Sequence, residues 1–135
     1  MTRIHVVVVG GGYAGTLAAN HLTVRPDLDV TLVNPRPAFI ERIRLHQYVA
    51  GTHPATVDYG TLLGAGVRLV VDTAARIDAA DRRLLLASGA ELRYDYLIYA
   101  AGSTAAVPDL LAEVPGAAEF AYLLAEFEQA QRLHA

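Results

Sequence analysis

The sequence contains no cysteine. This absence excludes disulfide bonds, metal sites built from thiolates and catalysis by a cysteine nucleophile. The five histidines do not supply a metal site instead, because no two of them stand at the His-x-x-x-His spacing that places two imidazoles on one helix face. We therefore expect neither metal nor thiol chemistry.

Lysine is also absent, so all 11 basic residues are arginines, and 14 acidic residues bring the formal net charge to −3. The arginines form no basic block, and nucleic acid is therefore not an expected partner. No apolar stretch reaches the ~20 residues of a membrane span, and the first residues lead into a strand without a signal peptide. We expect a cytoplasmic protein and leave open a peripheral contact with the inner face of the membrane.

Hydrophobic residues make up 53% of the 135 positions, which supports one globular domain with one core. Valine-rich apolar runs predict strands, and apolar residues at helical spacing predict helices. The expected strands are residues 3–9, 29–33, 67–71 and a strand within 94–103. The expected helices are residues 13–24, 39–49, 59–63 and 119–134.

Residues 74–89 fit two structures. Helix propensity favours one helix, with Gly89 as its C-cap. The alternative is a β-meander with a turn at 79–81, a strand at 83–87 and a second turn at 88–89. The pattern of the residues does not decide between them.

A glycine cluster follows the apolar run at residues 4–9 and has the spacing Gly10-x-Gly12-x-x-Gly15. A helical segment with small residues comes next, and a second apolar run at 30–33 completes a β-α-β pattern. This arrangement is typical of dinucleotide binding, because bare backbone and a helix N-terminus approach the pyrophosphate together.

Each residue of the glycine cluster has an expected task. Gly10 makes the tight turn, Gly12 admits the phosphates and Gly15 lets the helix pack closely on the sheet. The N–H groups of Tyr13 and Ala14 are expected to point at phosphate oxygens.

Four passages together resemble the FAD-binding half of the flavoproteins with two dinucleotide-binding domains, namely residues 6–15, 30–37, 39–46 and 94–103. This family includes type II NADH dehydrogenases, apoptosis-inducing-factor-like oxidoreductases and disulfide reductases. The resemblance implies an α/β fold: a Rossmann-like FAD-binding domain whose parallel sheet carries a β-meander, which favours β structure for residues 74–92. It implies FAD as cofactor and NAD(P)H as co-substrate.

The resemblance also implies contacts with the adenosine half of the cofactor. Asn34 stands where the family has Glu or Asp on the ribose hydroxyls, and Pro35 and Arg36 follow it. A neutral residue followed by arginine also suits the 2′-phosphate of NADP. Ala74 and Ala75 correspond to backbone that contacts adenine, although a plain strand connection explains them equally well.

Further residues correspond to family positions near the flavin and pyrophosphate. Arg42 and Arg44 lie in that region, and a solvated helix face is the alternative for both. Ala100, Ala101 and Gly102 match the motif at which the chain leaves the FAD domain, with Ala101 in place of the usual threonine.

The resemblance implies hydride transfer from NAD(P)H to FAD, and then electron transfer to a quinone or another acceptor. No catalytic side chain is implied, and the absence of cysteine excludes the disulfide-reductase branch. We expect residues 1–117 to form the N-terminal part of the FAD domain. Residues 118–135 are expected to form a helix leading toward an NAD(P)H domain before which the chain is truncated.

Two other functions remain open. One is an NAD(P)-binding Rossmann domain that uses the same glycine turn. The other is a non-catalytic truncated domain. We expect it to form a homodimer through surface that the absence of the remaining domain leaves uncovered.

Overall fold

The computed structural model describes residues 2–103 and 113–135. The chain forms two compact units, one of residues 1–39 and 57–102 and the other of residues 40–56 and 103–135. Each unit is described separately.

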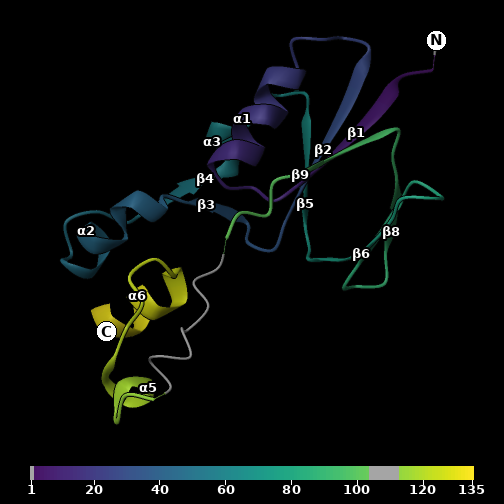
Figure 1. Cartoon of the computed structure of the whole chain (residues 1–135). Coiled ribbons are helices and arrows are strands. Elements are labelled where there is room, and N and C mark those ends of the chain that lie inside the picture. Colours follow the sequence, from purple (N-terminus) through teal and green to yellow (C-terminus); the bar gives the residue numbers. More distant parts are fainter. Residues whose placement is uncertain (1, 104–112) are drawn as a thin grey trace. The chain divides into compact units, whose positions relative to one another are not determined.

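The first unit is built on a four-stranded parallel sheet in the order β5-β2-β1-β9 (Figure 1). Its registers pair Val6 with Val30 in β2 and with Tyr96 in β9. The four buried valines that end β1 are apolar on both faces of the strand, as expected for a central parallel strand. The strands are β1 (Ile4–Val9), β2 (Leu28–Asn34), β5 (Val67–Val71) and β9 (Tyr96–Tyr99).

Helix α1 (Tyr13–Leu22) joins β1 to β2 and packs on one face of the sheet. Val8 and Leu32 face it and form a core with Ala19, all three fully buried. Helix α3 (Tyr59–Leu62) contributes the buried ring of Tyr59 to the same core. This face therefore contains the segment that follows the glycine cluster.

The opposite face of the sheet is covered by a three-stranded antiparallel meander of β6 (Ala74–Asp78), β7 (Arg83–Leu86) and β8 (Glu91–Arg93). Leu84 and Leu86 alternate inward and pack on Val7 and Val9, which point away from α1 because side chains alternate along a strand. The β-meander is confirmed and the helical alternative for residues 74–89 is wrong. Burying this alternating leucine pair outweighs a helix propensity that is a weak preference.

Three short elements replace the helix expected at residues 39–49. Strand β3 (Ala38–Ile40) pairs with β4 (Thr56–Asp58) in a two-stranded sheet. The short 3₁₀ helix η1 (Arg42–Arg44) and helix α2 (Leu45–Val49) follow β3. The expectation was correct for the last turns only.

The single helix expected at residues 119–134 is wrong. The structure has α5 (Ala117–Phe120) and α6 (Phe127–His134), separated by backbone that is extended at Ala121 and Glu126. Contacts distant in sequence set this break. Ala130 is buried in a cluster with Leu45 and Ala55. Arg42 of η1 donates a hydrogen bond to the carbonyl of Ala125.

Candidate dinucleotide site

The glycine cluster lies at the carboxyl end of β1, between β2 on one side and β9 on the other. The strand order reverses there, and such switch points are where open α/β sheets bind nucleotides. Gly10 has a φ of +102°, a conformation that only glycine adopts readily. Its N–H donates to the carbonyl of Val33 at 2.8 Å, so the loop begins as an extension of the sheet.

The second small-residue motif packs directly against this loop. A Cβ on Gly10 would collide with the carbonyl of Ala100 and lie 2.9 Å from the Cα of Ala101, while a Cβ on Gly15 would collide with the carbonyl oxygen of Gly10. The N–H of Ala100 donates to the carbonyl of Val9 at 2.8 Å. The structure thus brings together two motifs that the sequence separates widely.

Unpaired amides surround the open side of the loop. Gly12 is the N-cap of α1 and has no side chain that could accept a hydrogen bond from the first amides of the helix. The first amide with a carbonyl partner is that of Thr16, which donates to the Gly12 carbonyl at 3.0 Å. The amides of Tyr13, Ala14 and Gly15 therefore have no carbonyl within the helix to donate to. A Cβ on Gly12 would meet nothing within 4 Å, so the backbone is accessible. These residues fit a diphosphate group.

Asn34 joins the loop to the turn that follows β2. Its side chain is buried, with 9% of the residue exposed. Its Oδ1 accepts the Gly11 N–H at 3.0 Å, and its Nδ2 donates to the Arg36 carbonyl at 2.8 Å. The Asn34 side chain thus has a structural partner at both ends. The predicted roles of Asn34, Pro35 and Arg36 at an adenosine ribose or phosphate stay predictions.

Two hydroxyl groups beneath the loop were not singled out in the sequence. Thr16 Oγ1 donates to the Gly11 carbonyl at 3.1 Å, and the Tyr59 hydroxyl donates to the same oxygen. The Phe39 ring meets the rings of Tyr13 and Tyr59 edge-on, at centroid distances of 5.0 and 6.4 Å. Tyr59 lies 48 positions from Gly11, so no local pattern could have indicated the contact.

Burial raises the pKa of the Tyr59 phenol from 10.0 to about 12, although the charge of Arg36 acts in the opposite direction. The unfolded chain releases this proton first, so stability present below pH 10 is lost as the pH rises toward 12. We expect a loss of about 2 kcal/mol over this range. Urea unfolding of the wild type and Tyr59→Phe measures it, because only the wild type contains this proton. Parallel pH curves for the two proteins would contradict this prediction.

The two arginines expected near the cofactor have partners within the second unit. Arg42 donates to the carbonyls of Ser103 and Ala125 at 2.8 and 3.1 Å, and pairs with Glu126 at 3.4 Å. Arg44 donates to the Gln47 side chain at 3.1 Å and forms an ion pair with Glu41 at 3.5 Å. Their contact with a pyrophosphate stays a prediction.

The other predicted site residues differ in exposure. Ala74 packs against the core under the meander, whereas Ala75 is exposed at a register shift in β6. Ala100 is half-buried, Ala101 is exposed, and Gly102 adopts a φ of +71°. An adenine contact at Ala74 and Ala75 stays a prediction.

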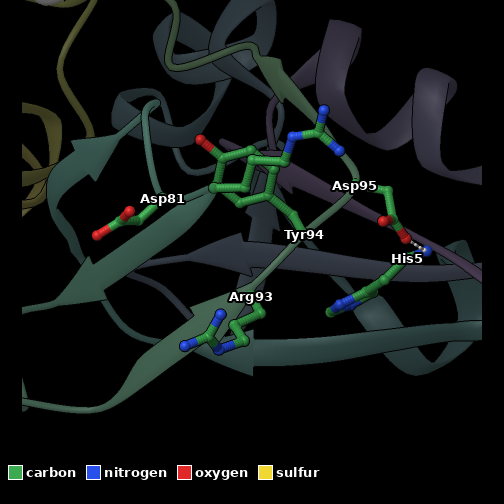
Figure 2. Close-up of a pocket in the computed structure, with 6 residues that line it drawn as sticks. His5, Asp81, Arg93, Tyr94 and Asp95 are labelled. Atoms are coloured by element: carbon green, nitrogen blue, oxygen red, sulfur yellow. Dashed lines mark hydrogen bonds between the residues drawn. The ribbon is translucent and has the colours of Figure 1, made fainter.

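A hollow of about 260 Å³ lies at the end of β1 opposite to the glycine loop (Figure 2). His5 and Asp95 meet there, where the backbone N–H of His5 donates to the Asp95 carboxylate at 2.8 Å. Arg93, Tyr94 and Asp81 also line it. Its charges are mixed and it is separate from the glycine loop. Within residues 2–103 and 113–135, no group of acidic residues and histidines is arranged to hold a metal ion, and no helix is long and apolar enough to span a membrane.

A parallel sheet with a glycine turn, free helix amides and a second small-residue motif at its switch point defines a Rossmann-type dinucleotide-binding domain. Residues 4–135 match the pyridine nucleotide-disulphide oxidoreductase family, and the chain belongs to that family. The expected cofactor, FAD with NAD(P)H as co-substrate, agrees with membership of this family of pyridine nucleotide oxidoreductases.

Similar proteins agree with this identification. The chain is 37% identical to a NADH dehydrogenase-like protein of Mycobacterium tuberculosis, over 98% of this chain and 34% of that protein. It is 32% identical to a sulfide-quinone reductase of Aquifex aeolicus, over 73% of this chain and 24% of that protein. The chain therefore spans about a third or less of the length of these relatives.

Solved structures share the fold. The sulfide:quinone oxidoreductase of Aquifex aeolicus matches 97% of this chain and 30% of its own, at 25% identity and a TM-score of 0.80. NDH2 of Plasmodium falciparum matches 98% of this chain and 28% of its own, at 21% identity and a TM-score of 0.78. The α/β fold predicted from the sequence is confirmed.

Proposed function

We propose that this chain is the FAD-binding part of an NAD(P)H-dependent flavoprotein oxidoreductase. The observation that carries the proposal is the open glycine loop, where the unpaired amides of Tyr13, Ala14 and Gly15 surround an accessible Gly12. A flavin bound there would supply the hydride acceptor for NAD(P)H and pass electrons to a quinone or another acceptor. This chain's own residues would bind the diphosphate and orient the cofactor.

The division of tasks along the chain is part of the proposal. Residues 1–117 would form the N-terminal part of the FAD domain, and residues 118–135 would lead toward an NAD(P)H domain. The coverage of about a third of each relative supports this division, because the other tasks of such an enzyme need more chain. The 135-residue chain alone is expected to lack NADH oxidation.

The test is direct binding of FAD to the untagged 135-residue chain. We expect gel filtration after mixing to leave flavin absorbance with the protein, and titration to quench flavin fluorescence with an equimolar end point. NADP is the comparison ligand, because Asn34 and Arg36 suit a 2′-phosphate as well. Retention of NADP in preference to FAD would favour a nicotinamide-binding domain. Retention of neither ligand would contradict both the FAD-binding and the nicotinamide-binding assignment.

We also propose self-association and a cytoplasmic location with peripheral contact to the inner face of the membrane. Strand β9 is an edge of the parallel sheet, and its Tyr96 and Tyr99 are 65% and 69% exposed. Exposed edges and apolar patches favour pairing with another chain. Sedimentation velocity at rising concentration measures self-association, and pelleting with lipid vesicles measures membrane contact. A monomer at every concentration would contradict self-association, and protein that stays in the supernatant would contradict membrane contact.

A further inference from the structure

The Gly11–Gly12 peptide sits at the centre of the glycine loop, and side chains from two elements, α1 and α3, hold its carbonyl. The preceding Gly10–Gly11 peptide is held by Asn34 of β2, which accepts the Gly11 N–H at 3.0 Å. Thr16 of α1 donates to the Gly11 carbonyl at 3.1 Å, and Tyr59 of α3 donates to that same oxygen. All three side chains are buried, so water does not compete readily for these bonds.

The direction of this carbonyl determines where the next amide points. The described residues contain no cis peptide bond. In a trans peptide the C=O and the following N–H point in opposite directions. Because the Gly11 carbonyl points at the hydroxyls of Thr16 and Tyr59, the Gly12 N–H points away from them. The space around Gly12 is open, since a Cβ there would meet nothing within 4 Å.

Side-chain sterics do little to hold this peptide. Gly10, Gly11 and Gly12 are consecutive, and glycine adopts mirror-image backbone conformations at little steric cost. A peptide between two glycines can therefore rotate and reverse its C=O and N–H. Hydrogen bonds must supply the orientation that a Cβ supplies elsewhere in the chain.

We propose that Tyr59 is a positioning residue whose hydroxyl fixes the Gly12 amide toward a bound diphosphate. This inference rests on the proposed function, because it takes the glycine loop to be a diphosphate site. Tyr59 contacts the carbonyl side of the peptide and not the ligand. Tyr59 is 2% exposed and its ring packs edge-on against Phe39, so the hydroxyl is presented from within the core. At neutral pH the phenol keeps the proton that it donates, because even the ordinary tyrosine pKa of 10.0 lies well above that pH.

The test compares ADP with adenosine as probes of the 135-residue chain. Tyr59→Phe keeps the ring and removes the hydroxyl. We expect its dissociation constant for ADP to rise about fivefold to tenfold. The hydrogen bond from the Gly12 N–H to the charged phosphate is weakened, but Thr16 still holds the Gly11 carbonyl. Adenosine lacks the diphosphate, and its affinity is expected to stay unchanged. Tyr48→Phe is the matched control, because that ring packs on Phe127 in the second unit.

A backbone spectrum supplies a second readout that a purely structural role would not move. In ¹H–¹⁵N correlation spectra, ADP is expected to shift the Gly12 amide strongly in the wild type and weakly in Tyr59→Phe. Adding Thr16→Val to Tyr59→Phe removes both donors and is expected to weaken ADP binding further.

The outcomes separate the two proposals. Equal ADP affinity in the wild type and Tyr59→Phe would overturn the positioning role, as would equal losses for ADP and adenosine. A wild-type chain that binds neither FAD nor ADP would instead overturn the proposed function. Selective loss of ADP affinity in Tyr59→Phe, with a Gly12 amide that ADP shifts strongly in the wild type and weakly in the variant, supports the positioning role.

Discussion

Gly15→Ala is expected to lower the free energy of unfolding by about 3 kcal/mol, the upper range for forcing an extra group into a packed site. The new Cβ would collide with the carbonyl oxygen of Gly10 and lie 3.5 Å from the Cβ of Ala100. The atoms that the new Cβ would meet most closely belong to the backbone of Gly10, which cannot move aside as the end of a flexible side chain can. Helix propensity favours alanine over glycine by about 1 kcal/mol and predicts the opposite sign.

Urea unfolding followed by circular dichroism measures this effect. Gly12→Ala is the matched control, since it adds the same methyl group at the same helix end in open space. A Gly15→Ala protein as stable as the wild type would show that α1 can move off the sheet. The close helix–sheet packing inferred at Gly15 would then be wrong.

Gly12→Ala is expected to separate binding from stability. Its backbone has a φ of −79° and a ψ of −161°, which alanine adopts without strain, and the added Cβ meets nothing within 4 Å. The free energy of unfolding should change by at most about 1 kcal/mol, the cost of alanine at an N-cap. A methyl group there would occupy the approach of the diphosphate, and we expect FAD affinity to fall about 100-fold, equivalent to roughly 2.7 kcal/mol.

Fluorescence titration with FAD measures that loss, and thermal unfolding without ligand verifies the fold. Riboflavin serves as a control ligand because it lacks the diphosphate. Unchanged FAD affinity in a folded Gly12→Ala protein would place the diphosphate elsewhere and remove the main support for the proposed function.

Local patterns predicted the parts of the fold whose conformation is decided locally. The valine run of β1 and the glycines after it specify a buried strand and a turn with positive φ, and both occur. The meander followed from the family resemblance. Its decisive contact, Leu84 and Leu86 against Val7 and Val9, joins segments too distant for a periodicity to reveal.

The errors arose where partners are distant in sequence. Apolar spacing within residues 119–134 suggested one helix, but Arg42 and the cluster around Leu45 set the break. In the candidate site, the glycines were recognisable because their backbone task requires glycine. Tyr59 was not, because an isolated tyrosine has no pattern that shows which carbonyl it approaches.

The contact between Gly10 and Ala100 has a consequence for how the protein matures. The amide of Ala100 closes on Val9 only after β9 has docked beside β1. On the ribosome, about ninety further residues must emerge after the glycine loop before that support exists. If the glycine loop binds flavin as proposed, flavin retained by a nascent chain would report that β9 has docked beside β1.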